Sequence, residues 1–362
     1  MNKQLILGGL LSLGVSMTSH AETGLYNDNG EHSQYRHLIV FGDSLSDQGV
    51  QNQNPVNLEE IKEATYSTPG SKMWPEYVAT ALRTRITYNN TAFLGQDDNS
   101  YVKVIPGGRN FASGGATTQG QGITLSCVSD ESETCYNPPS VEQQVDTYLA
   151  SLSGRLDRGH NLYAFWAGAN NVFITLEAML EQTATPEDVV ASAVTAATQE
   201  ANIINNLNHH FLSKNNNGAD FLVFNMPDLG STPLGQQSAE LSALLSTASQ
   251  AYNATLYSLL QNEGIKAYYI DVNSLVDAGI NNPAHTIDVN GRTIKFDNVT
   301  TPACGANSKA LTCIPDQSHA NYLFEDDIHP TGLGQYVIGM TAANCVTKGS
   351  ESTQPYCELI NH

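Results

Sequence analysis

Short apolar segments alternate with longer amphipathic segments along most of the chain. Four apolar runs stop abruptly where glycine or polar residues begin, a profile typical of buried strands. They cover residues 38–41, 162–166, 221–224 and 267–270. We therefore predict a set of short strands separated by helices.

The segments between these runs carry helix signals. Thr185 followed by Pro186 and an acidic third position gives an N-cap and first turn, which predicts a long helix running towards His210. Residues 238–261 form a second amphipathic pattern, ended by Gly264. Strand and helix alternating in this way predict an α/β fold with a parallel sheet covered on both faces. In such sheets ligands bind beyond the carboxyl ends of the strands.

The N-terminus has the features of an export signal. A basic start at Met1-Asn2-Lys3 precedes an apolar stretch over 5–15 and small residues up to Ala21. We predict a signal peptide over 1–21 and one domain over 22–362, secreted to the periplasm or the medium. No later segment reaches the roughly 18 uninterrupted apolar residues of a membrane span, so stable membrane insertion is not expected.

The charge balance narrows the range of partners. Lys and Arg number 16 against 36 Asp and Glu, for a net charge of −20. Such a surface repels phosphate backbones, which argues against nucleic acid, and gains nothing from anionic membranes. The sequence has no zinc-type ligand spacing, and its Asp- and Asn-rich turns lack the spacing of an EF-hand. We therefore predict no metal site, and the sequence does not indicate an oligomeric state.

The six cysteines fall as close neighbours along the chain. In an exported protein the simplest of the many possible schemes pairs each with its neighbour. That scheme predicts bonds Cys127–Cys135, Cys304–Cys313 and Cys345–Cys357.

Two distant stretches supply a nucleophile and a base. The first apolar run ends at Gly42-Asp43-Ser44, which predicts a tight turn exposing the Ser44 hydroxyl. Near the other end of the chain Asp326 lies three residues before His329, a spacing that allows the carboxylate to orient the imidazole while its other nitrogen faces Ser44. Ser44, Asp326 and His329 are therefore our candidate catalytic residues.

Two further turns offer oxyanion donors. The loop 110–116 is rich in small residues, and its Gly115 N–H can approach a ligand closely. Asn170 follows the second apolar run and can direct its amide NH2 at the same place. We predict an oxyanion hole formed by the Ser44 N–H, Gly115 and Asn170.

Each assignment has a structural alternative. Ser44 would also serve as a helix N-cap, and Gly115 and Asn170 would also serve as turn formers. Asp316 and His319 form a second Asp-x-x-His, but no apolar residue between them anchors a turn, whereas His329 follows Ile328 and precedes a core-facing helix. We therefore favour His329.

Four motifs in this order resemble the GDSL or SGNH hydrolases: 42–45, Gly115, Gly168-x-Asn170, and Asp326-x-x-His329-Pro330. Residues 224–230 additionally resemble the secreted lipolytic members that include the glycerophospholipid:cholesterol acyltransferase group. In the family an Asp usually follows the third-block Asn, and here Asn171 stands in its place. We expect Asn171 to support the turn.

The resemblance implies a three-layer α/β/α, flavodoxin-like fold, an acyl-ester substrate and no cofactor. It favours a phospholipase A, a lysophospholipase or an esterase of broad specificity, with acyltransferase activity as a possible additional reaction of the same site. A carbohydrate or polymer acetylesterase uses the same blocks, and a non-catalytic binding protein with this fold is the third alternative.

Two long insertions flank the predicted site. Residues 117–140 follow the predicted oxyanion loop, and residues 281–325 precede Asp326. Long loops beside a site usually form lids or binding rims. We expect the first to shield the substrate groove, the alternative being a surface excursion fixed by its disulfide.

Overall fold

A five-stranded sheet forms the centre of the molecule. The structure, a computed structural model, describes residues 35–49, 51–53, 65–94, 101–104, 107–123, 137–154, 160–213, 219–306, 310, 313, 315–352 and 355–362. The central strands are β1 (His37–Gly42), β5 (Asn161–Trp166), β6 (Asp220–Phe224), β7 (Ala267–Ile270) and β10 (Cys357–Ile360), in the order β1-β5-β6-β7-β10. The first four are parallel and β10 is antiparallel to β7. The four strands predicted from the apolar runs are confirmed.

Both faces of the sheet are buried, and this explains why its strands have continuous apolar sequences. In β1, Ile39 and Phe41 pack into one core while Leu38 and Val40 pack into the other, because successive side chains of a strand point to opposite faces.

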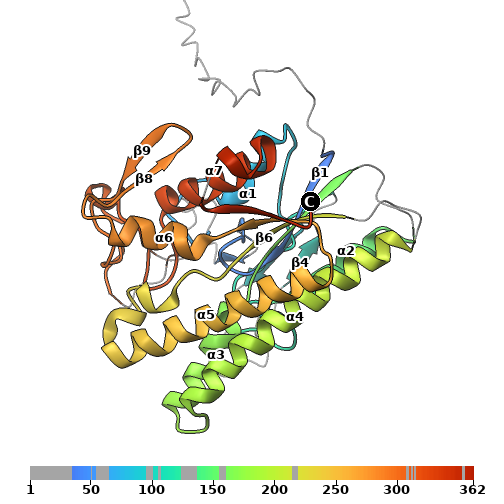
Figure 1. Cartoon of the computed structure of the whole chain (residues 1–362). Coiled ribbons are helices and arrows are strands. Elements are labelled where there is room, and N and C mark those ends of the chain that lie inside the picture. The colour runs from blue at the N-terminus through green and yellow to red at the C-terminus, as the bar shows by residue number, and fades with distance from the viewer. Residues whose placement is uncertain are drawn as a thin grey trace, which may run out of the picture.

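The helices form a layer on each side (Figure 1). α1 (Trp74–Ala81), α6 (Val272–Asn281) and α7 (Gly332–Lys348) contribute to the core of Leu38 and Val40. The core on the opposite face of the sheet is lined by α2 (Val141–Ser151), α3 (Ala169–Leu180), α4 (Pro186–Leu212) and α5 (Ala239–Asn262). The result is the predicted three-layer α/β/α architecture.

The helix limits follow the sequence signals. The Thr185 side chain caps α4 by accepting from the Asp188 N–H, and Asp188 bonds back to the Thr185 N–H at 2.8 Å. Ser238 caps α5 in the same way, accepting from Leu241. Gly264 follows α5 with φ +66°, a left-handed conformation that glycine adopts without penalty. The two predicted long helices are therefore confirmed.

Smaller elements lie outside the central sheet. One three-stranded sheet contains β2 (Gln51–Gln53), β3 (Asn90–Leu94) and β4 (Tyr101–Val104), and the hairpin β8 (Thr286–Val289) with β9 (Arg292–Lys295) lies in the second insertion. The 3₁₀ turns with bounds in the described residues include η1 (Leu229–Ser231), η2 (Gly235–Gln237), η4 (Gln317–His319) and η5 (Ser350–Ser352).

The outer edge of β1 is covered by a loop. Val40 N–H donates to Arg109 O at 2.9 Å, and Phe111 N–H donates to Val40 O at 2.8 Å. The loop that carries Gly115 therefore pairs with the outer edge of β1 through one residue, Asn110, as a single parallel bridge.

Two of the three predicted disulfides are present, Cys304–Cys313 and Cys345–Cys357. Cys127 and Cys135 lie outside the described residues, as does the predicted signal peptide. Across the described parts of the chain, the helices lack the combination of length and apolarity that would let one cross a bilayer.

Candidate functional site

The nucleophile candidate lies on the turn that ends β1. Asp43 accepts the Leu45 N–H through its side chain at 3.0 Å, and the Ser46 N–H bonds to Asp43 O at 3.1 Å. These two short-range bonds fold the chain back immediately after the strand. Ser44 lies on this turn with 7% of its surface exposed, so its hydroxyl is accessible only from one side.

Buried amide side chains fix the turn from both sides of the sheet. Gln144 of α2 accepts the Gly42 N–H and donates to the Gly42 carbonyl, both at 2.9 Å. Gln335 of α7 donates to Leu45 O at 3.4 Å, and Asn110 donates to Ser46 O at 2.7 Å. Because these groups are buried, each bond satisfies a polar group that water does not reach. The position of Ser44 is thus set by two helices and one loop.

The imidazole reaches this turn from 285 residues away. His329 Nε2 lies 2.8 Å from Ser44 Oγ, and His329 Nδ1 lies 2.8 Å from Asp326 Oδ2. The structure therefore joins the three predicted catalytic side chains in one chain of hydrogen bonds. Such a chain is the arrangement in which an imidazole can accept a hydroxyl proton while a carboxylate stabilises the resulting cation.

Asp326 and His329 shift each other's pKa values towards the charged forms, carboxylate and imidazolium. Burial alone would raise the pKa of Asp326, but the charge of His329 and hydrogen bonds from His329 and from the Ala310 N–H lower it to about 2. Burial alone would lower the pKa of His329, but the Asp326 carboxylate outweighs this and raises it above its ordinary value. Asp326 is therefore ionised at neutral pH and strengthens His329 as a base.

A second buried carboxyl lies beside the imidazole. Asp43 is 1% exposed, and burial raises its pKa to about 7. Its negative charge contributes to the raised pKa of His329. From the sequence, Asp43 is part of the turn that presents Ser44; the structure adds this electrostatic effect on His329.

The ring of Tyr66 packs on the imidazole, with centroids 4.9 Å apart. A Cβ at Gly114 would lie 2.2 Å from the Tyr66 ring. Only a glycine at this position leaves space for the aromatic ring against His329.

The two predicted oxyanion segments meet each other. Gly115 has φ +81°, and the carbonyl of the following residue, Ala116, accepts the Asn170 side-chain amide at 2.8 Å. That bond uses one of the two amide hydrogens of Asn170. Asn171 Oδ1 accepts the Thr118 N–H at 3.1 Å, so it does support the turn by joining it to the other segment.

Tyr252 packs against the turn at Ala167 and Gly168, which precedes Asn170. Tyr252 of α5 donates its hydroxyl to Glu200 at 2.7 Å and contacts Ala167 O at 3.0 Å. Its ring lies where a Cβ of Gly168 would be, and Gly168 has φ +106°. Burial raises the pKa of Glu200 to about 8, so this carboxyl is largely protonated at neutral pH.

The alternative base makes different contacts. His319 Nδ1 is 2.9 Å from Ala303 O, and its ring stacks on Tyr322. Asp316 caps the short η4 turn through the Ser318 N–H. It is thus His329 whose ring contacts Ser44.

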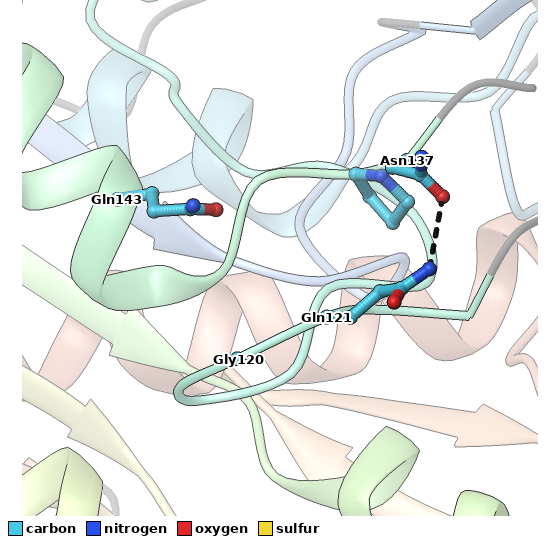
Figure 2. Close-up of a pocket in the computed structure, with 5 residues that line it drawn as sticks. Gly120, Gln121, Asn137 and Gln143 are labelled. Carbon is cyan, nitrogen blue, oxygen red and sulfur yellow. Dashed lines mark hydrogen bonds between the residues drawn. The ribbon is translucent and has the colours of Figure 1, made fainter.

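The base of the first insertion borders a cavity of about 340 Å³ (Figure 2). Gln121 donates to Asn137 Oδ1 at 3.4 Å across it, and Gly120, Pro138 and Gln143 complete the lining. Ile123 N–H donates to Gly115 O at 2.8 Å, so the cavity adjoins the loop that carries Gly115. The remainder of this insertion lies outside the described residues.

The described residues contain one group with metal-ligand atoms close together, formed by Cys304, Cys313 and Glu325. The two sulfurs are joined in a disulfide and so are not thiolates. Because the thiolate is the form that binds metal, this group is not a metal centre in the oxidised protein.

Several supporting residues were not predicted from the sequence. Gln144, Gln335 and Tyr252 lie at core-facing positions of ordinary amphipathic helices, where a polar residue among apolar ones was the available signal. Ala310 acts through its backbone N–H, which no side-chain pattern reveals.

Comparison with known proteins agrees with this geometry. Residues 38–341 match the family described as GDSL-like lipase/acylhydrolase. The chain is 28% identical over 227 residues to "Lipase 1" of Photorhabdus luminescens, which covers 62% of this chain and 26% of that protein. It is 27% identical over 332 residues to an "uncharacterized protein in trpE-trpG intergenic region" of Pseudomonas putida, covering 89% and 50% respectively.

The chain thus spans half or less of the length of these two relatives. The family match extends from β1, the strand that carries the nucleophile candidate, into α7, the last long helix. On this match the chain belongs to the GDSL-like lipase/acylhydrolase family.

Proposed function

We propose that this protein is a secreted serine hydrolase that cleaves acyl esters of lipids through an acyl-enzyme on Ser44. The observation that carries the proposal is the hydrogen-bonded chain from Ser44 Oγ through His329 to Asp326, placed at the carboxyl end of β1. Family membership supports ester hydrolysis, and the name of the Photorhabdus relative supports a lipid substrate.

In the first half of the reaction, His329 Nε2 accepts the Ser44 proton while Oγ attacks the ester carbonyl carbon. The carbonyl oxygen becomes an oxyanion, and the Ser44 N–H, the Gly115 N–H and the second amide hydrogen of Asn170 stabilise it. Collapse of this intermediate breaks the bond to the alcohol, which leaves with the proton from His329. Ser44 is then esterified by the acyl group.

In the second half, His329 takes a proton from water, whose oxygen attacks the acyl carbon and releases the fatty acid and free Ser44. If another alcohol, such as a sterol, occupies the place of water, the acyl group passes to it instead. Asp326 remains ionised throughout and stabilises the imidazolium. Hydrolysis and transfer therefore use the same residues and differ only in the acceptor.

Specificity is proposed to reside in the two insertions. The cavity at the base of 117–140 adjoins the Gly115 loop and is lined by amides without charged groups. This location supports a role for the insertion as a rim of the substrate groove. Nicking of 117–140 should then impair long-chain substrates more than a small ester, and equal effects on the two substrates would argue against the rim role.

Export is part of the proposal. The two disulfides of the described chain support an oxidising compartment, where such bonds persist. The sequence pattern of residues 1–21 supports a cleaved signal peptide. N-terminal sequencing of protein from the periplasm or the medium should begin at Glu22.

The test is product analysis by mass spectrometry after incubation with phospholipids, lysophospholipids, a sterol and an acetylated sugar. We expect free fatty acid and lysolipid, plus sterol ester if transfer occurs, and none of these with the Ser44→Ala variant. Acetate released from the sugar without fatty acid would overturn the lipid assignment in favour of an acetylesterase. Products that still form with the Ser44→Ala variant would overturn the assignment of Ser44 as the nucleophile.

A further inference from the structure

The disulfide Cys304–Cys313 closes a loop beside the segment that carries Asp326. Cys304 N–H donates to Glu325 O at 3.0 Å, and Ala303 N–H donates to Phe324 O at 2.9 Å. These bonds align the start of the loop with the residues immediately before Asp326. The loop and the catalytic segment are therefore attached along one edge by backbone hydrogen bonds.

Within this loop, Ala310 contacts the carboxylate directly. Its N–H donates to Asp326 Oδ2 at 3.0 Å, and the residue is 2% exposed. Asp326 Oδ1 accepts two other backbone donors, the Ile328 N–H at 2.9 Å and the His329 N–H at 2.7 Å. Those two come from the turn of Asp326 itself, whereas Ala310 approaches from a separate part of the chain.

The two carboxylate oxygens are consequently oriented by different elements. The Ile328 and His329 N–H groups hold Oδ1, the Ala310 N–H holds Oδ2, and His329 Nδ1 lies 2.9 Å from Oδ1 and 2.8 Å from Oδ2. A carboxylate rotates easily about its terminal torsion, which is broad and roughly two-fold. The Ala310 donor on Oδ2 therefore adds to the turn's own donors on Oδ1 in restricting the plane of the carboxylate relative to the imidazole.

We propose that the loop closed by Cys304–Cys313 is a positioning element for catalysis: the disulfide fixes Ala310, and the Ala310 N–H orients Asp326 towards His329. This inference rests on the proposed roles of Asp326 and His329. Ala310 is a positioning residue, because it touches neither the substrate nor the reacting atoms. Turnover then depends on this disulfide beyond what fold stability requires.

The second disulfide provides a matched control. Cys345–Cys357 joins α7 to β10 at the edge of the sheet, and its sequence separation of 12 is close to the 9 of Cys304–Cys313. Because the loop-closure contribution depends only weakly on loop length, removal of either bond should destabilise the protein similarly. A difference in turnover between the two variants would then report on Asp326.

The experiment compares Cys304→Ser/Cys313→Ser with Cys345→Ser/Cys357→Ser on a water-soluble p-nitrophenyl ester, well below both melting temperatures. We expect kcat of the first variant to fall roughly 10- to 100-fold, the range for losing a hydrogen bond to a charged group, with KM within about twofold. The second should retain the wild-type kcat. Equal kcat values for the two variants would overturn the proposal.

Ala310→Pro tests the donor with the disulfide intact, since proline has no N–H. We expect a similar fall in kcat and an acid limb of kcat/KM shifted to lower pH, because a carboxylate no longer oriented towards His329 attracts the imidazolium less strongly. Ala310→Gly, which keeps the N–H, should restore most of the rate. An Ala310→Pro variant that folds and keeps both kcat and its pH profile would contradict the positioning role.

Ser44→Ala separates this inference from the proposed function. If Ser44→Ala is inactive while the Cys304/Cys313 and Ala310→Pro variants turn over normally, only the positioning role fails. If Ser44→Ala keeps the wild-type rate, the proposed function itself fails.

Discussion

The two halves of the candidate site are built by different means. Ser44 lies at the end of a buried strand, and its turn is bonded to Gln144 and Gln335 from helices on opposite sides of the sheet. His329 and Asp326 lie in an irregular segment between a hairpin and α7, beside a loop closed by a disulfide. Ser44 is therefore positioned by the central fold, and His329 and Asp326 by local turns and a nearby disulfide.

This difference predicts different responses to mutation. Support for Ser44 is also support for the core, so its loss should reduce stability and activity together. Support for His329 lies outside the central sheet, so its loss should reduce activity more than stability. The following predictions test that contrast, from the largest expected effect to the smallest.

Ser44→Ala should abolish turnover, because no other group forms the acyl-enzyme; in serine proteases loss of the nucleophile costs on the order of a million-fold in kcat. Ser46→Ala is the matched control in the same turn. The Ser46 hydroxyl accepts the Trp74 indole N–H at 3.0 Å, so its removal should cost about 1–3 kcal/mol of unfolding free energy and leave most of the turnover. Steady-state kinetics and thermal unfolding of both variants check this.

Asp326→Asn should lower kcat at neutral pH on the order of 1,000- to 10,000-fold, with little change in the melting temperature. In the wild type, kcat/KM should fall as pH drops through the raised pKa of His329, because the protonated imidazole cannot accept the Ser44 proton. In Asp326→Asn burial remains but the attracting charge is lost, so the acid limb should move to lower pH. A limb that stays in place would argue against the Asp326–His329 coupling.

Asn170→Ala should lower kcat by roughly 100- to 1,000-fold, the scale for removal of one oxyanion donor. Asn171→Ala removes only the bond to Thr118 and should cost much less. If the two variants lose the same amount, the Asn170 effect reflects the turn and not the oxyanion. Kinetics with a soluble ester, with KM reported separately, distinguish the cases.

Gln144→Ala should have the smallest effect on rate, about tenfold or less, but should lower the melting temperature clearly. It leaves the Gly42 N–H and carbonyl buried without their partner, at about 1–3 kcal/mol for each group. A variant with unchanged stability but greatly reduced kcat would reverse the contrast drawn between the two halves of the site.

The same contrast explains what could be predicted from the sequence. The four strands and two long helices could be predicted from apolar periodicity and capping residues. Each of these is a local sequence pattern, and burial of its apolar residues in the core stabilises the element. The contact of Ser44 with His329 is long-range, and the sequence pointed to it only through the chemistry of the residues: a serine at a strand end, the Asp-x-x-His spacing and the order of the motifs.

Other features had no sequence signal of their own. The bond from Ala310 to Asp326 involves only a backbone donor, and the raised pKa of Asp43 depends on burial by residues distant in the sequence. Both are products of tertiary structure. Residue type and spacing therefore pointed to the candidate groups Ser44, Asp326 and His329, but not to the environment that shifts their pKa values.

The loop that carries Gly115 also covers the outer edge of the sheet, since its backbone forms hydrogen bonds with Val40 of β1. An uncovered outer strand of apolar residues is a template for pairing with another chain. Any condition that detaches this loop would therefore displace the proposed oxyanion donor Gly115 and also expose the backbone hydrogen-bonding groups of β1. Inactivation and aggregation should then begin at the same temperature.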